Sequence, residues 1–199
     1  QSIGGVKEPP KVNKDLLLTS YIFDFLAISL SLFYIGYLFF MATLVCSILS
    51  KAYSHPRIRL KKNPFLSWLT VSIFQGPFIY LAIFLSFSSS WPIDLKQQWA
   101  AALSTAFLFG GAYPMTQIFQ HEEDRKRGDE TLSLKLGIKG TFLFSAMSFL
   151  IGTLLLFYYQ FINKKFEVFY IFPLFMLPTF IYFSYWFFLC LRNESEVNF

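Results

Sequence analysis

Cysteine, histidine and charged residues are few in the sequence. Most soluble proteins have more charged residues, and disulfide frameworks and cysteine metal sites need more cysteines. Only two cysteines and two histidines occur among 199 residues, and charged residues make up 15% of the chain, against roughly 25% in a typical soluble domain. Cys46 and Cys190 each lie in an apolar run without a metal-type partner nearby, so we interpret both as packing residues. The first fifteen residues are polar and contain no cleavable signal sequence.

Apolar and aromatic residues fill most of the chain instead. Hydrophobic residues make up 55% and aromatic residues 21%, and the mean hydropathy is +0.48, which is typical of a polytopic membrane protein. A span needs about 20 mostly apolar residues. The suitable runs are Leu16–Ser50, long enough for a hairpin divided near Tyr34–Gly36, and then Phe65–Phe87, Trp99–Phe119, Thr141–Phe161 and Phe166–Leu191. The sequence therefore predicts an all-α fold, a polytopic transmembrane helix bundle with six visible spans in one domain, residues 1–199.

Basic residues gather in four segments, which the predicted spans place on the same side of the membrane. The other connections between spans lie on the opposite side. The N-terminal loop, the segments 51–64 and 121–140 and the C-terminal tail hold fourteen of the seventeen Lys and Arg residues. Because cytoplasmic loops carry an excess of Lys and Arg, this asymmetry places the four segments in the cytoplasm. The cluster at 51–64 is either a topology signal, a site for anionic membrane lipid or a ligand site. We expect no nucleic-acid partner.

Two polar residues inside predicted spans each have two interpretations. Asp24 lies within the first span, where an acid suggests a functional site, but we favour an interfacial residue that reaches water. Gln75 precedes Gly76 and Pro77 in the third span. Its amide either faces a substrate cavity or satisfies a backbone carbonyl that the proline frees.

The stretch Tyr113–Gly137 is where carboxylates, amides, bases and a glycine gather. At about 100° per residue, one face of a helix that extends the fourth span would carry four of its polar residues. These residues are Gln117, Gln120, His121 and Asp124. Such a stripe indicates a site at the membrane surface. The alternative is a charged loop that only marks the end of the helix.

This stretch resembles the second aspartate-rich motif of the UbiA superfamily of intramembrane prenyltransferases. The family pattern closes on a Gly-x-x-Thr-Leu stretch and then Leu-Gly, which this chain matches at Gly128, Thr131, Leu132, Leu136 and Gly137. The family's three metal-side positions then fall on Gln117, Gln120 and Asp124, and the resemblance implies catalytic roles for them. It also implies Mg²⁺ binding by Asp124 and Gln120. Because Mg²⁺ is usually held by carboxylates, we expect Glu122 or Glu123 to supply further charge, and Glu123 is the ligand that we predict.

A second segment is similar to the family's basic stretch, YS-x-P-x-x-R-L-K. The matching residues are Tyr53, Pro56, Arg59 and Lys61. In the family a tyrosine and basic residues face the diphosphate of the prenyl donor. The chemistry suits these residue types, because a diphosphate needs several directional N–H donors. We therefore favour diphosphate binding over a topology signal alone for four residues: Tyr53, Arg57, Arg59 and Lys61.

The resemblance implies an enzyme, a Mg²⁺-dependent transferase of alkyl groups other than methyl. It would move an isoprenoid group from a prenyl diphosphate to a lipophilic, often aromatic, acceptor within the cell inner membrane. The alternative is a non-catalytic membrane carrier or scaffold that keeps the fold and has lost a full metal site. A CDP-alcohol phosphatidyltransferase also handles diphosphates in a membrane, but its Asp-Gly-x-x-Ala-Arg signature is absent from the sequence.

Members of this family have nine helices, with a first aspartate-rich motif after the second helix. Here six spans are visible and no Asn-Asp-x-x-Asp motif occurs. We therefore expect a fragment that is truncated at both ends and inactive by itself, with an acid-rich motif in the residues that precede Gln1.

Overall fold

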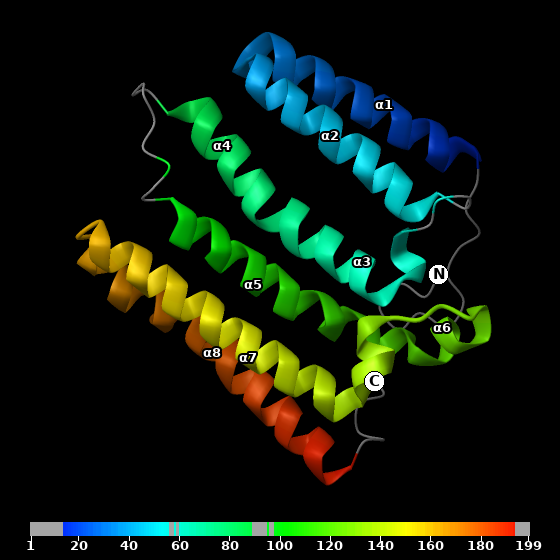
Figure 1. The fold of residues 1–199 in the computed structure, drawn as a ribbon, viewed down its shortest axis with the longest axis vertical. Coiled ribbons are helices and arrows are strands. Elements are labelled where there is room, and N and C mark those ends of the chain that lie inside the picture. The colour runs from blue at the N-terminus through cyan, green and yellow to red at the C-terminus, as the bar shows by residue number, and fades with distance from the viewer. Residues whose placement is uncertain (1–13, 56–57, 59, 89–94, 96–97, 194–199) are drawn as a thin grey trace.

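The computed structural model is a series of helices in which each long helix packs against the next along the chain (Figure 1). It describes residues 14–55, 58, 60–88, 95 and 98–193, and within these ranges no strand occurs. The long helices are α1 (Lys14–Leu30), α2 (Tyr37–Ser54), a continuous rod Pro64–Phe87, α5 (Trp99–Gln117), α7 (Leu132–Ile162) and α8 (Phe166–Arg192). The rod consists of α3 (Pro64–Thr70), the π-helical segment η3 (Val71–Phe78) and α4 (Ile79–Phe87). The prediction of an all-α membrane bundle is confirmed.

The lengths and exposed surfaces of these helices suit a bilayer. Among the described residues, four helices are long and apolar enough to cross it: Asp15–Ile35, Pro64–Phe87, Leu132–Ile162 and Tyr170–Arg192. Tyr37–Tyr53 is a shorter apolar helix. The edge helices α1 and α8 expose most of their large apolar side chains, as expected of surfaces that face lipid.

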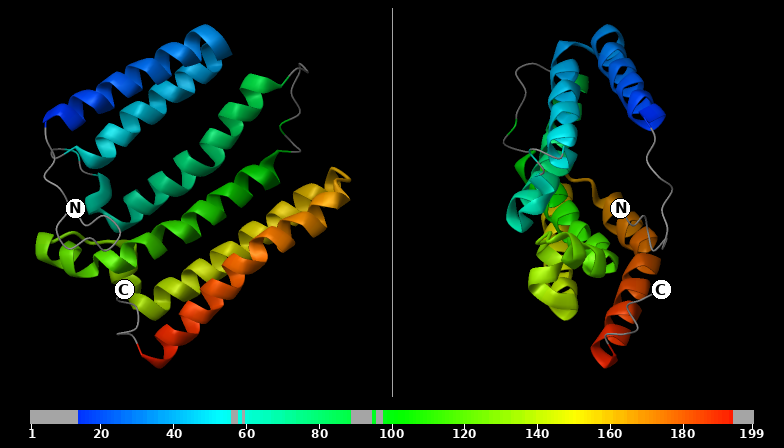
Figure 2. Two further views of the ribbon diagram at one scale, coloured as in Figure 1. Left: turned by 180° about the vertical axis from the view of Figure 1, so that it is seen from behind. Right: turned by 90° about the vertical axis from the view of Figure 1, so that its right-hand side faces the viewer.

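The polar connections gather at one end of the bundle. The start of α1, the connection from α2 to α3, the short helix α6 (His121–Arg127) and the end of α8 all lie at that end (Figures 1 and 2). The turn between α1 and α2 and the turn between α7 and α8 lie at the opposite end (Figure 1). The helices therefore run up and down in the order that the placement of basic residues predicts.

The hairpin predicted within residues 16–50 turns at Gly36. A π-helical turn, η1 (Ser31–Ile35), follows α1, and Gly36 N donates a hydrogen bond to Ser31 O at 2.9 Å. Gly36 has a φ of 136°, which L side chains rarely adopt. Glycine therefore allows the chain to reverse at this position.

Small residues bring α5 and α7 within backbone contact. A Cβ built on Gly111 would lie 2.9 Å from Ser148 Cβ, and one built on Gly152 would lie 3.2 Å from Ser104 O. Ser145 Oγ donates to Gly111 O at 2.7 Å. Ser104 Oγ donates to Gly152 O, also at 2.7 Å. Close approach and interhelical hydrogen bonds of this kind hold helices together in a membrane, where apolar side chains gain little by leaving lipid.

The rod packs against another side of α5 in the same way. A Cβ built on Gly76 would lie 2.9 Å from Ala106 N, and Trp68 Nε1 donates to Gly110 O at 2.9 Å. The π-helical winding of η3 contains Gly76 and Pro77. The predicted break in the third span is therefore a change of winding within one continuous helix.

The fifth span begins earlier than the sequence predicts. α7 starts at Leu132 rather than Thr141. α6 occupies residues for which the sequence predicts either an extension of the fourth span or a charged loop. Thr131 Oγ1 caps α7 by accepting from Leu134 N at 3.4 Å. Gly137, with a φ of 68° and a ψ of 176°, interrupts the helix before its apolar part. Apolar run length cannot detect these polar first turns, which explains the difference.

We predict that Gly111→Val will weaken the packing of α5 on α7. Its methyl groups would meet Ser148 and the ring of Phe149, and overpacking of this kind costs about 1–3 kcal/mol. The measurement is the midpoint of thermal unfolding in detergent, which should fall. Leu154→Val, at an exposed position of α7, is the control and should leave the midpoint unchanged. Equal midpoints for the two variants would contradict the close approach at Gly111.

Candidate functional site

A pocket of about 600 Å³ lies between α2, the rod and α5. Its lining comes from residues 46–53 of α2, 70–79 of the rod and 109–116 of α5, and is mostly apolar or aromatic with a few hydroxyls and one amide. Both its volume and its lining are typical of a small-molecule site, in which a few placed polar groups orient the ligand.

Two tyrosines form a hydrogen bond at the α6 end of this pocket. Tyr53 Oη of α2 and Tyr113 Oη of α5 bond to each other, and both residues line the pocket. Their bond uses only one of the two hydroxyl protons, so the pair keeps one O–H donor for a ligand. Tyr53 is one of the residues that the sequence predicts. Tyr113 is not, although it lies four residues before Gln117 and so on the same face of α5.

Asp124 lies near the tyrosine pair. Its side chain is 6% exposed, and its carboxylate is close enough to the Tyr53 hydroxyl for the two groups to interact electrostatically. Gly128, with a φ of 67°, ends α6 in the left-handed conformation just after Asp124. Glu122, two residues before Asp124, is exposed. The two acids therefore point in different directions from α6.

The predicted polar stripe does not continue along one helix. A 3₁₀ turn, η5 (Ile118–Gln120), separates α5 from α6, so Gln117 and Asp124 belong to different helices. Gln117 is 5% exposed, and its Oε1 accepts a hydrogen bond from Ser133 N at 3.3 Å. The first N–H groups of a helix have no partner within it. Gln117 therefore supplies an acceptor to the first turn of α7.

His121 belongs to the same cluster of hydrogen bonds. Its Nε2 is 2.7 Å from Ser133 Oγ, which is in turn 3.0 Å from Thr141 Oγ1. Burial lowers the pKa of His121 below its ordinary value, and the positive charge of Arg125 lowers it further. A neutral His121 thus joins α6 to the polar first turns of α7.

Two of the residues predicted to bind diphosphate, Arg57 and Arg59, lie outside the described residues, as does the side chain of Lys61. Their neighbours show where the basic segment runs. A hollow of about 430 Å³ is lined by residues of the segment 58–66 together with Gly128 and Glu130. The basic segment therefore lies beside the loop between α6 and α7.

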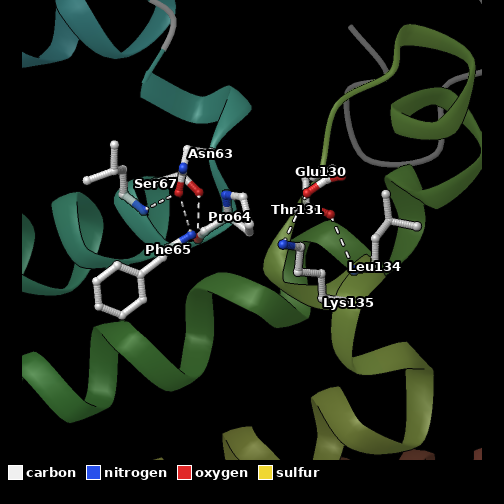
Figure 3. A network of polar contacts seen from close by, with 9 residues as sticks. Asn63, Pro64, Phe65, Ser67, Glu130, Thr131, Leu134 and Lys135 are labelled. Carbon is white, nitrogen blue, oxygen red and sulfur yellow. Dashed lines mark hydrogen bonds and ion pairs between the residues drawn. The ribbon is translucent and has the colours of Figure 1, made fainter.

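Figure 3 shows residues of the segment at 63–67 and of the segment at 130–135, which face each other here. On one side, Asn63 Oδ1 caps α3 by accepting from Phe65 N and Leu66 N, each at 3.0 Å. On the other side, Glu130 pairs with Lys135 at 3.1 Å. Local hydrogen bonds and an ion pair thus hold the start of α3 and the start of α7 beside this hollow.

The described residues do not make a complete Mg²⁺ site. Within them, no three His, Cys, Asp or Glu side chains lie close enough together to hold a metal ion. Of the residues predicted to face the metal, Asp124 is buried, and Gln120 and Glu123 are half-buried. Mg²⁺ is usually bound through one or two carboxylates together with substrate phosphates, and Asp124 and Glu123 are the two carboxylates among these residues. Further charged ligands would have to come from the substrate or from outside the described ranges.

Asp24, the acid within the first span, has an ionic partner. Its carboxylate forms an ion pair with Lys51 of α2, and Lys51 Nζ lies 4.9 Å from the centroid of the Tyr21 ring. Neither member of the ion pair lines the pocket. Asp24 thus joins α1 to α2.

Comparison with known proteins adds one finding. The sequence matches the UbiA prenyltransferase family over residues 12–198. This match covers all six long helices and both polar segments described above. No curated protein and no solved structure matches the chain.

We predict that Gln117→Met will destabilise the start of α7, because Ser133 N would lose its acceptor in a buried position. An unmade hydrogen bond of this kind costs about 1–3 kcal/mol, and the thermal unfolding midpoint in detergent should fall. Gln120→Met makes the same change at a half-buried amide and should have a much smaller effect. A Gln117→Met midpoint equal to that of the unmodified protein would show that the amide does not stabilise α7.

Proposed function

Because the chain belongs to the UbiA prenyltransferase family, we propose that it transfers an isoprenoid group from a prenyl diphosphate to a lipophilic, often aromatic, acceptor within the membrane. Family membership supports a prenyltransferase-type function in general, and the substrates are the specific part of the proposal. The observation that carries it is the meeting of distant segments. Tyr53 of the basic stretch lines the pocket, and the carboxylate of Asp124, from the aspartate-rich motif, lies close enough to the Tyr53 hydroxyl to interact with it electrostatically.

The diphosphate belongs at the α6 end of the pocket. Arg57, Arg59 and Lys61 follow soon after α2 in the chain, and their cationic N–H groups suit the oxygens of a diphosphate. The Tyr53 hydroxyl, in the last turn of α2, provides another hydrogen bond. The isoprenoid chain then extends from this end into the apolar part of the pocket.

In the proposed reaction, the bond between the allylic carbon and the diphosphate oxygen breaks, and its electron pair leaves with the diphosphate. Cationic side chains beside the diphosphate would stabilise this developing negative charge and so lower the barrier. An electron-rich carbon of the acceptor then bonds to the allylic cation and loses a proton. Phe74 and Phe109 in the pocket wall exclude water and stabilise the cation with their rings.

Prenyltransferases of this family generally use Mg²⁺, and we include the ion in the proposal. When bound, it would neutralise charge on the leaving diphosphate. Asp124 is the charged ligand that this chain offers at the tyrosine pair, with Gln120 and Glu123 as the other predicted ligands.

The end of the bundle that carries α6 is proposed to face the cytoplasm from a cell inner membrane. This orientation is supported by the fourteen of seventeen Lys and Arg residues whose segments lead to that end. It would give the basic segment access to a water-soluble diphosphate head group while the isoprenoid chain stays in the bilayer.

A non-catalytic carrier or scaffold is the second candidate function. Two observations favour it: the Gln117 amide is used to hold α7, and the described residues contain no cluster of three metal-ligating side chains. A carrier would bind an isoprenoid lipid without breaking its bond to diphosphate. Release of diphosphate therefore distinguishes the two functions.

We predict that Asp124→Asn will abolish prenyl transfer by the full protein in liposomes, because it removes a negative charge beside the tyrosine pair with little change in size. Arg59→Ala should have the same effect by removing a diphosphate contact. Glu122→Gln makes a matched change at an exposed neighbour of Asp124 and should retain most of the activity. All three variants should insert normally, since no span loses apolar length.

The measurements are transfer of a labelled isoprenoid group and release of diphosphate. Unchanged transfer by Asp124→Asn would remove this residue from the site. An unmodified protein that binds a prenyl diphosphate without ever releasing diphosphate would favour the carrier.

A further inference from the structure

Gln75 presents a polar amide to the pocket about halfway across the bundle. It lies on η3, eleven residues after Pro64, which at 1.5 Å per residue is about 16 Å from the start of the rod. The hydrocarbon core of a bilayer is about 30 Å thick, so the amide lies near its middle. The side chain is exposed and lines the pocket.

The packing of the rod sets this orientation. Ser72 and Gly76, four residues apart, are the buried residues of η3. Gly76 lies against the α5 backbone at Ala106, and Ser72 Oγ lies 2.8 Å from the position of a Cβ on Gly110. These contacts fix the side of η3 that faces α5 and leave Gln75 to line the pocket.

The Gln75 amide does not bond to the backbone carbonyl that Pro77 leaves without a donor. Pro77 has no N–H, so it leaves a carbonyl of the helix without its usual donor, and a glutamine side chain is able to supply one. Within the described residues, no hydrogen bond joins the Gln75 amide to this carbonyl or to another protein group. An amide in apolar surroundings costs free energy until it has a partner. A bound ligand is the partner that the pocket can hold.

We propose that Gln75 binds the acceptor of prenyl transfer through a hydroxyl or carbonyl oxygen on an aromatic ring. This inference rests on the proposed function. The isoprenoid chain of the donor has no hydrogen-bonding group to offer at this depth, so the donor does not satisfy the amide. A primary amide donates two hydrogen bonds and also accepts, which matches phenolic and quinone oxygens.

The hydroxyl groups of the pocket narrow the chemistry of the ligand. Thr70 Oγ1 and Thr116 Oγ1 donate their protons to backbone carbonyls of their own helices, at 2.6 and 2.7 Å. The strong donors that remain are the Gln75 amide, the Ser50 hydroxyl and one hydroxyl of the tyrosine pair. These free donors suit a ligand that carries acceptor oxygens.

The walls of the pocket suit a planar ring. Phe74 is adjacent to Gln75 on η3, and Phe109 lines the pocket from α5. Aromatic side chains pack favourably against another ring in stacked or edge-on arrangements. A ring bonded to Gln75 would lie deeper in the pocket than the Tyr53–Tyr113 pair and so on the membrane side of the proposed diphosphate position.

Two matched probes, 2-naphthol and naphthalene, test this proposal by binding to the full protein in liposomes. They share the same rings, and only 2-naphthol can form a hydrogen bond with the amide. After correction for partition into protein-free liposomes, the unmodified protein should bind 2-naphthol about three- to tenfold more tightly, the effect of one neutral hydrogen bond.

Three variants isolate the amide. Gln75→Met keeps the approximate size without the amide and should abolish the preference for 2-naphthol. Gln75→Asn retains an amide and should keep part of the preference. Ile73→Met, at an exposed position of η3 outside the pocket, is the control and should keep all of it. Equal preference in Gln75→Met and the unmodified protein would overturn the assignment.

A transfer assay separates this proposal from the proposed function. Gln75→Met should raise the KM for a phenolic acceptor about fivefold, the loss of one neutral hydrogen bond, and leave the KM for the prenyl diphosphate unchanged. If Gln75→Met leaves the KM for the phenolic acceptor unchanged, the acceptor contact is refuted but the transferase function is not. An unmodified protein that prefers 2-naphthol through Gln75 but shows no transfer would refute the transferase function and with it the role of Gln75 towards an acceptor.

Discussion

Close packing of backbone around α5 is the constraint on which the rest of the structure depends. Glycines at 76, 111 and 152 allow the rod and α7 to approach α5 at distances that a side chain would prevent. Within a bilayer, apolar side chains gain little by leaving lipid, so contact and hydrogen bonding must hold the helices together. The position of the rod on α5 then determines which side of η3 faces the pocket, and the position of α7 determines where the polar loop after α5 can lie.

The polar residues at the α6 end divide into two groups with different tasks. Gln117, His121, Ser133 and Thr141 bond to one another and hold the first turns of α7. The tyrosine pair lines the pocket, and Asp124 lies close enough to Tyr53 for their side chains to interact electrostatically. The residues of the first group form these hydrogen bonds with one another, so the group provides a rigid support for Asp124 and the tyrosine pair.

The pocket combines two requirements that oppose each other in an intramembrane transferase. A developing carbocation needs apolar and aromatic walls that exclude water, and an acceptor needs polar groups that orient it. Here the walls are largely apolar, and the polar groups are few and separated in depth, with Tyr53 and Tyr113 at one end and Gln75 further in. In the proposed function, this separation keeps the diphosphate and the acceptor on either side of the reacting carbon.

The sequence by itself determined the helical class, the hairpin near Gly36, the position at Gly76 and Pro77 where the winding of the rod changes, and the family motifs. Span length follows from bilayer thickness, and turns follow from local backbone chemistry. Only the tertiary structure decided that Gln117 supports α7, that Tyr113 bonds to Tyr53, and that the Gln75 amide faces the pocket rather than its own helix. These outcomes depend on the rotation of each helix about its axis and its shift along its neighbours. Contacts between residues far apart in the chain set both quantities, and no single segment of the sequence contains them.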